Sequence, residues 1–279
     1  MKRRILLPTD FSDNSWSAIV YVLKLFKDEE CMFYLLHSTA MKVSTMSNFS
    51  NRLLKAMKVN ALKELNEIKE QMEAADANAN HEFKNVLSTL DLYDAIEFEV
   101  KQSKIDLVVM GTKGATGAKE IFFGSNTVRV IKKIKNCPIL IVPDEHDYVT
   151  PKQITFPTDF KRRNSQENLE VLKAIAEVHD SKIRVLHINE EEELSPEQER
   201  NYNYLKDQLA NFKLSFHWLP DYSTKAFEIN EFIRDLGINI LVMVYYKRSL
   251  IEKIMNEPVI KKIGFHPIIP FLVIPSQED

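Results

Sequence analysis

Short apolar runs alternate with longer amphipathic segments along the whole chain. Residues from Trp16 to Phe26 place apolar side chains at helical spacing, with Ser12 or Asp13 positioned to cap that helix. The runs at 105–110 and 139–142 do not alternate between apolar and polar residues, which is typical of parallel strands covered on both faces. In the first half, the pattern predicts strands at 4–8, 31–38, 81–88, 105–111 and 138–143, and helices at 12–26, 51–75, 91–102 and 124–135.

Strands separated by helices in this way predict an α/β domain: a parallel sheet with right-handed crossovers. By analogy with doubly wound folds, the expected strand order is 3-2-1-4-5. In that order the chain reverses its winding direction between strands one and four. Ligands of such sheets bind at this point, outside the carboxyl ends of the strands. Candidate chemistry is therefore expected where strands one and four end.

The second half of the chain repeats motifs of the first half in the same order. The tetrapeptide PTDF occurs at Pro8–Phe11 and at Pro157–Phe160, and VIKKI occurs at 130–134 and at 259–263. Ordered repeats of this kind predict a tandem duplication. We expect two domains of the same doubly wound fold, at 1–146 and 151–279, with a polar seam between them.

Composition narrows the classes of function. The chain of 279 residues has a formal net charge of −3, which gives no general electrostatic reason to expect binding to nucleic acid or to a membrane surface. No apolar run is long enough to span a bilayer, and the N-terminus lacks the apolar core of a signal peptide. The 2 cysteines do not suggest a disulfide framework, and the histidines lack metal-binding spacing. We therefore expect a cytoplasmic protein without a protein-built metal site.

Glycine is concentrated in one stretch, GTKGATGAKEIFFGS, between Gly111 and Ser125. It follows the fourth expected strand directly. A bare loop that leads into a helix N-terminus presents main-chain amides to an anion, and the helix dipole favours negative charge there. Neither the Walker A spacing nor the Rossmann spacing of glycines is present. Residue chemistry alone leaves two interpretations open, a phosphate-bearing ligand or a flexible turn between strand and helix.

The two motifs together, PTDFS after the first strand and Gly-x-x-Gly-x9-Gly-Ser after the fourth, resemble the universal stress protein family. In that family the full glycine motif marks the members that bind ATP. The resemblance covers the first copy and implies one ATP site there, with Asp10 as a polar anchor and a candidate neighbour of the Mg²⁺ of MgATP. Asn126 departs from the family, where a small apolar residue is usual, and we expect its main-chain amide to serve. The implied binding residues are Pro8, Thr9, Asp10, Ser38, Met110, Gly111, Thr112, Lys113, Gly114, Gly124, Ser125, Asn126 and Thr127.

The second copy keeps the family's pattern of elements but loses its glycines. Asp159 matches Asp10, yet the fourth strand of this copy runs into VYYKRSLIEKIMNEPVI, which contains no glycine. We expect Tyr245, Tyr246 and Arg248 to fill the crevice, and we expect no ATP to bind there. Asp159 is then expected to act as a turn or capping residue.

The resemblance implies an ATP-binding regulator of the stress response. No obvious general base or arginine finger accompanies Asp10, so we expect at most weak ATP hydrolysis rather than a dedicated enzyme. Two alternatives stay open: an interaction protein whose crevices are relics, and a slow ATP hydrolase. The fifth strands of the two copies are expected to pair within the chain as an internal pseudo-dimer, which covers exposed sheet edges. A further homodimer stays open.

Overall fold

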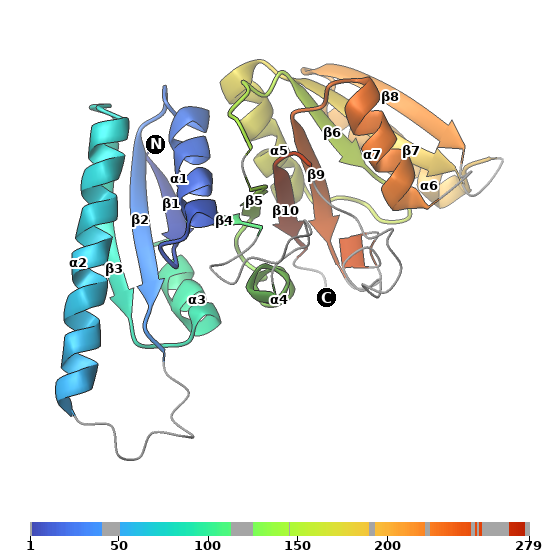
Figure 1. The fold of residues 1–279 in the computed structure, drawn as a ribbon. Coiled ribbons are helices and arrows are strands. Elements are labelled where there is room, and N and C mark those ends of the chain that lie inside the picture. The colour runs from blue at the N-terminus through green and yellow to red at the C-terminus, as the bar shows by residue number, and fades with distance from the viewer. Residues whose placement is uncertain are drawn as a thin grey trace. The chain divides into compact units, whose positions relative to one another are not determined.

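The computed structural model describes residues 2–40, 51–112, 125–144, 146–189, 193–220, 224–246, 249, 251–252 and 268–276. The chain forms two compact units, Met1–Tyr148 (unit 1) and Val149–Asp279 (unit 2). Figure 1 shows strands and helices alternating along the chain in both units.

Unit 1 alternates strands and helices from its first described residues to its last strand. Its elements are β1 (Arg3–Pro8), α1 (Asp13–Leu25), β2 (Cys31–Ser38), α2 (Asn51–Ala75), β3 (His81–Ser88), α3 (Leu92–Gln102), β4 (Leu107–Gly111), α4 (Ser125–Lys133) and β5 (Ile139–Val142).

Unit 2 follows the same alternation of strand and helix. Its elements are β6 (Gln153–Pro157), α5 (Gln166–His179), β7 (Lys182–Asn189), α6 (Pro196–Gln208), β8 (Lys213–Pro220), α7 (Lys225–Asp235), β9 (Ile240–Tyr245) and β10 (Phe271–Pro275).

The predicted strand order is confirmed in both units. Unit 1 has the order β3-β2-β1-β4-β5 and unit 2 has the order β8-β7-β6-β9-β10, so each reads 3-2-1-4-5 in its own numbering. The pairs that carry this order, such as β1 with β2 and with β4, are parallel. Ile5 pairs with Leu107 in unit 1, and Ile154 pairs with Ile240 in unit 2. This register makes Val244 the counterpart of Gly111. The internal pseudo-dimer stays a prediction.

Burial explains the continuous apolar runs. Every residue of β4 and β5 is buried, because helices pack on both faces of the unit 1 sheet. Helices α1 and α2 contact each other and so share one face, whereas α3 contacts β1, β2 and α4 on the other. Each Val, Ile or Leu side chain buried in this way contributes about 1.5–3 kcal/mol. The sheet is therefore a rigid frame for the loops at its carboxyl edge.

The helix that follows β1 begins where the sequence predicted. Ser12 is the N-cap of α1, and its hydroxyl accepts a hydrogen bond from the main-chain N–H of Ser15 at 3.3 Å. The equivalent helix of unit 2, α5, is capped by Ser165, which accepts from the N–H of Asn168 at 3.2 Å.

Candidate functional site

The turn after β1 is built from the PTDF motif. The Thr9 hydroxyl accepts a hydrogen bond from the main-chain N–H of Phe11 at 3.0 Å, and Asp10 Oδ1 accepts from the Ser12 hydroxyl at 2.6 Å. These short polar side chains stabilise a tight turn by bonding to groups two residues ahead. Phe11 takes a left-handed conformation with φ of 65°. That conformation costs a bulky residue roughly 1–3 kcal/mol, and such strain is common at functional sites.

Unit 2 repeats this turn. The Thr158 hydroxyl accepts from the N–H of Phe160 at 3.1 Å, and Asp159 Oδ1 accepts from the N–H of Lys161 at 3.0 Å. Phe160 is also left-handed, with φ of 54°. The prediction that Asp159 serves as a turn residue agrees with this geometry.

A histidine at the end of the second strand of each unit holds the turn. Nδ1 of His37 lies 2.8 Å from the main-chain oxygen of Thr9, and the His37 ring stacks on Phe11 with centroids 4.3 Å apart. In unit 2, Nδ1 of His187 lies 2.9 Å from the oxygen of Thr158, and its ring lies 5.0 Å from that of Phe160. The spacing of the histidines in the sequence predicted only that they do not form a metal site. Their role in fixing the left-handed Phe could have been suspected from their presence at the same place in both copies.

Gly111, the last residue of β4, has a packing reason to be glycine. A Cβ on Gly111 would overlap the side-chain amide of Asn14 in α1, and it would lie 2.9 Å from the Asn14 main-chain oxygen. Gly111 therefore lets α1 approach the end of β4 closely. The sequence had predicted only that bare backbone here approaches a ligand, and that role stays a prediction.

The first turn of α4 is tied to the end of β4. The buried Thr127 hydroxyl donates a hydrogen bond to the main-chain oxygen of Gly111 at 3.1 Å. Thr112 is fully buried, and its hydroxyl has no hydrogen-bond partner within the part of the chain that the structure describes. Because β1 and β4 are neighbours, Pro8, Thr9 and Met110 lie at the same edge of the sheet as this group.

Other predicted site residues have partners of their own. The Ser38 hydroxyl donates to the Leu90 main-chain oxygen at 2.7 Å. The Tyr93 hydroxyl donates to Asn126 Oδ1 at 3.2 Å, and the Arg129 guanidinium lies 4.2 Å from the centre of the Tyr93 ring. Ser125 is exposed at the start of α4. Three further predicted site residues lie outside the described residues: Lys113, Gly114 and Gly124.

A cavity of about 380 Å³ opens beside the unit 1 turn, between the end of β2 and α2. This volume lies within the range of small-molecule sites, about 300–1,000 Å³. Its lining residues are Phe11, His37, Ser38, Thr39, Ala40, Met57, Asn60, Ala61 and Glu64.

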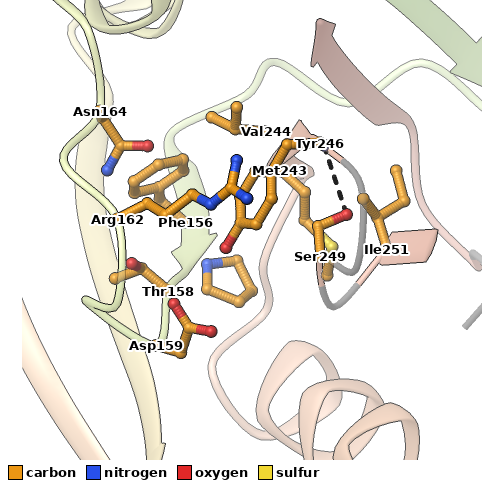
Figure 2. A pocket seen from close by; sticks show the side chains of 11 residues that line it. Phe156, Thr158, Asp159, Arg162, Asn164, Met243, Val244, Tyr246, Ser249 and Ile251 are labelled. Carbon is orange, nitrogen blue, oxygen red and sulfur yellow. Dashed lines mark hydrogen bonds between the residues drawn. The ribbon is translucent and has the colours of Figure 1, made fainter. Parts of the chain in front are cut away.

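In unit 2 the crevice at the ends of β6 and β9, the counterpart of the edge formed by β1 and β4, is occupied by side chains (Figure 2). Tyr246 lies over the turn that carries Thr158 and Asp159, and the Arg162 guanidinium lies 4.4 Å from the centre of the Tyr246 ring. The cavity that remains is about 30 Å³, which is room for only one or two water molecules. Two other residues were predicted to fill this crevice. Tyr245 is buried in β9 and is not among the described residues that line the cavity, and Arg248 lies outside the described residues.

Comparison with known proteins identifies the family. The model of the universal stress protein family matches residues 1–143, just over half of the chain. The chain belongs to the universal stress protein family. One universal stress protein of Methanocaldococcus jannaschii is 30% identical over 143 residues, which are 50% of this chain and 81% of that protein. A second protein of the same organism is 29% identical over 159 residues, which are 51% of this chain and 95% of that protein.

The likeness in fold extends over both units. The crystal structure of a universal stress protein from Archaeoglobus fulgidus has a TM-score of 0.74 and covers 99% of this chain and 97% of its own, at 16% sequence identity. At that identity the match shows the shared fold. No helix in the described parts of this universal stress protein is long and apolar enough to cross a membrane.

Proposed function

We propose that unit 1 binds ATP in the crevice outside the carboxyl ends of β1 and β4, and that the chain is a cytoplasmic, nucleotide-dependent regulator of the stress response. One observation carries the proposal. The strained PTDF turn and the glycine-serine segment follow two strands that are direct neighbours in the sheet. Two unusual sequences, far apart in the chain, therefore start from neighbouring strand ends, at the point where doubly wound sheets bind ligands.

The residues of unit 1 fit an adenine nucleotide. The N-terminus of α4, with Ser125 and Asn126, offers main-chain amides and a positive dipole end to phosphate oxygens. The buried Thr112 hydroxyl, which lacks a partner among the described residues, is a polar group that a ligand can satisfy. Pro8 and Met110 supply apolar surface, and the exposed Asp10 carboxylate can accept hydrogen bonds from ribose hydroxyls.

Catalysis is not part of this proposal beyond weak hydrolysis. Asp10 Oδ1 already accepts a hydrogen bond from the Ser12 hydroxyl, which orients the carboxylate within the turn. Among the described residues, no group of three or more His, Cys, Asp or Glu side chains is arranged to hold a metal ion. Any Mg²⁺ would therefore arrive with the nucleotide, beside Asp10.

Calorimetric titration with MgATP tests the proposal. Wild type is expected to bind, and Gly124→Asp is expected to lose binding because a carboxylate at the glycine motif repels phosphate. The matched control is Gly237→Asp, the same chemical change in unit 2, where a Cβ meets no atom within 4 Å. Its φ of 57° is left-handed, a conformation that Asp tolerates better than most residues, so we expect this control to fold with somewhat lower stability. Binding by wild type and by this control, but not by folded Gly124→Asp, supports the proposal. No binding by wild type contradicts it and favours an interaction protein.

A further inference from the structure

The two units differ in the segment that links the PTDF turn to the next helix. In unit 1 the N-cap Ser12 follows Phe11 directly. In unit 2 four residues, Lys161–Asn164, stand between Phe160 and the N-cap Ser165. The insertion therefore adds side chains at the mouth of the unit 2 crevice.

Arg162, from this insertion, pairs with Tyr246, the residue that follows β9. Its guanidinium lies 4.4 Å from the centre of the Tyr246 ring, a favourable distance for a cation–π contact. Figure 2 shows the phenol oxygen directed toward the turn that carries Thr158 and Asp159. The main-chain N–H of Tyr246 donates to the Ser249 hydroxyl at 3.4 Å, which helps to fix the residue.

The Asp159 carboxylate lies near the Tyr246 hydroxyl (Figure 2) and influences its ionisation. The pKa of Tyr246 is raised to about 12, mainly by burial and also by the charge of Asp159 and a side-chain hydrogen bond to it, whereas Arg162 lowers it. The phenol thus stays protonated and can donate to the carboxylate. In unit 1, Asp10 holds the same place in the same motif.

Helix α6 fixes the turn from the other side. Gln198 Nε2 donates to the main-chain oxygen of Asp159 at 2.9 Å, and Asn201 Nδ2 donates to that of Phe160 at 2.8 Å. The main-chain oxygens of Asp159 and Phe160 thus accept hydrogen bonds from side chains of α6.

We infer that Tyr246, with the exposed Arg162 against its ring, forms an internal plug that takes the place of a ligand in unit 2: an aromatic ring fills the crevice, with its hydroxyl directed toward the turn of the PTDF motif. The inference rests on unit 2 alone and does not depend on nucleotide binding by unit 1. It explains how unit 2 keeps the motif while leaving a cavity of only about 30 Å³. Unit 2 is closed whether or not nucleotide is present.

The test is chemical rescue with phenol. Tyr246→Ala removes the phenol group and is expected to lower the melting temperature, and added phenol is expected to raise it again by entering the vacated space. The matched control is Tyr204→Ala, which removes a ring that stacks on the neighbouring Arg163 at 3.8 Å but lies outside the crevice lining. Phenol is expected to leave the melting temperatures of this control and of wild type unchanged.

A second variant covers the case in which Tyr246→Ala does not fold. Tyr246→Phe keeps the ring and loses the hydroxyl, and we expect a melting temperature lower by roughly 2–4 °C. We also expect faster tryptic cleavage at the exposed Lys161, Arg162 and Arg163, identified by mass spectrometry of the fragments. A Tyr246→Phe variant with the melting temperature and the cleavage rate of wild type would overturn the inference. So does a folded Tyr246→Ala that phenol stabilises no more than it stabilises Tyr204→Ala.

Discussion

Gly111 at the end of β4 and Asn14 in α1 share a space that admits only one side chain. A Cβ on Gly111 would lie 2.7 Å from Cγ of Asn14, closer than real Cβ atoms approach other heavy atoms. One of the conspicuous glycines of the chain is therefore required by the packing of helix on sheet. The glycine motif serves the fold at its first position, whatever its later positions bind.

Gly111→Ala is expected to destabilise the protein by about 1–3 kcal/mol through overpacking, measured by urea unfolding. Asn14→Gly in the same chain is expected to restore only part of this loss, because the Asn14 main-chain oxygen also lies 2.9 Å from the added Cβ. A Gly111→Ala variant as stable as wild type would show that α1 moves away without cost.

Asp10 and Asp159 hold the same position in identical motifs, so the same substitution tests their different roles. Asp10→Asn keeps the acceptor oxygen of the turn, and we expect MgATP affinity to fall roughly 10-fold with little change in stability. Asp159→Asn is expected to leave MgATP affinity unchanged and to lower the melting temperature, because the Tyr246 hydroxyl loses a charged partner. Calorimetry and thermal unfolding measure the two effects, and equal effects of the two substitutions on affinity would contradict the account.

His81 joins three elements of unit 1 from a buried position. Its Nε2 lies 3.0 Å from the Phe26 main-chain oxygen, its Nδ1 is paired with the Asp76 carboxylate, and its ring meets Phe33 edge-on. We expect His81→Ala to cost about 3 kcal/mol, because it leaves a cavity and removes the ring nitrogens that contact the Phe26 main-chain oxygen and the Asp76 carboxylate. The control is the exposed Lys63→Ala, which is expected to change the free energy of unfolding by less than about 0.5 kcal/mol. Equal losses for the two variants would contradict this role.

The two cysteines are buried as thiols. Burial raises the pKa of Cys31 and of Cys137 from 9.0 to about 12. Folding therefore disfavours the thiolate, so the stability from these groups is complete below about pH 9 and is lost as pH rises toward 12. We expect no reaction of native protein with Ellman's reagent at pH 8 and reaction of both thiols after denaturation. Rapid reaction of the native protein would contradict their burial.

Sequence alone predicted much of the fold, because its signals are local. Apolar runs, the Ser12 cap and the repeated PTDF motif give the elements of each unit and the position of the turns, whereas the strand order came by analogy with doubly wound folds. The contact between Gly111 and Asn14 joins residues far apart in the chain, and no pattern along the sequence reveals it.

The candidate site was predicted less completely than the fold. The strained turn was visible as a repeat, but the left-handed conformation of Phe11 and its stacking on His37 depend on how β1 and β2 lie side by side. In unit 2 the sequence predicted that Tyr246 fills the crevice. It did not predict Arg162, because the role of a four-residue insertion depends on where its side chains fold back.

The central claim is one nucleotide site, in unit 1, and a closed crevice in unit 2. Protein purified from cells and then denatured releases whatever nucleotide it carried, and chromatography quantifies it per chain. The account predicts about one ATP per chain for wild type and none for folded Gly124→Asp. About two nucleotides per chain would contradict the closure of unit 2. No nucleotide, together with no affinity for added MgATP, would contradict the site in unit 1.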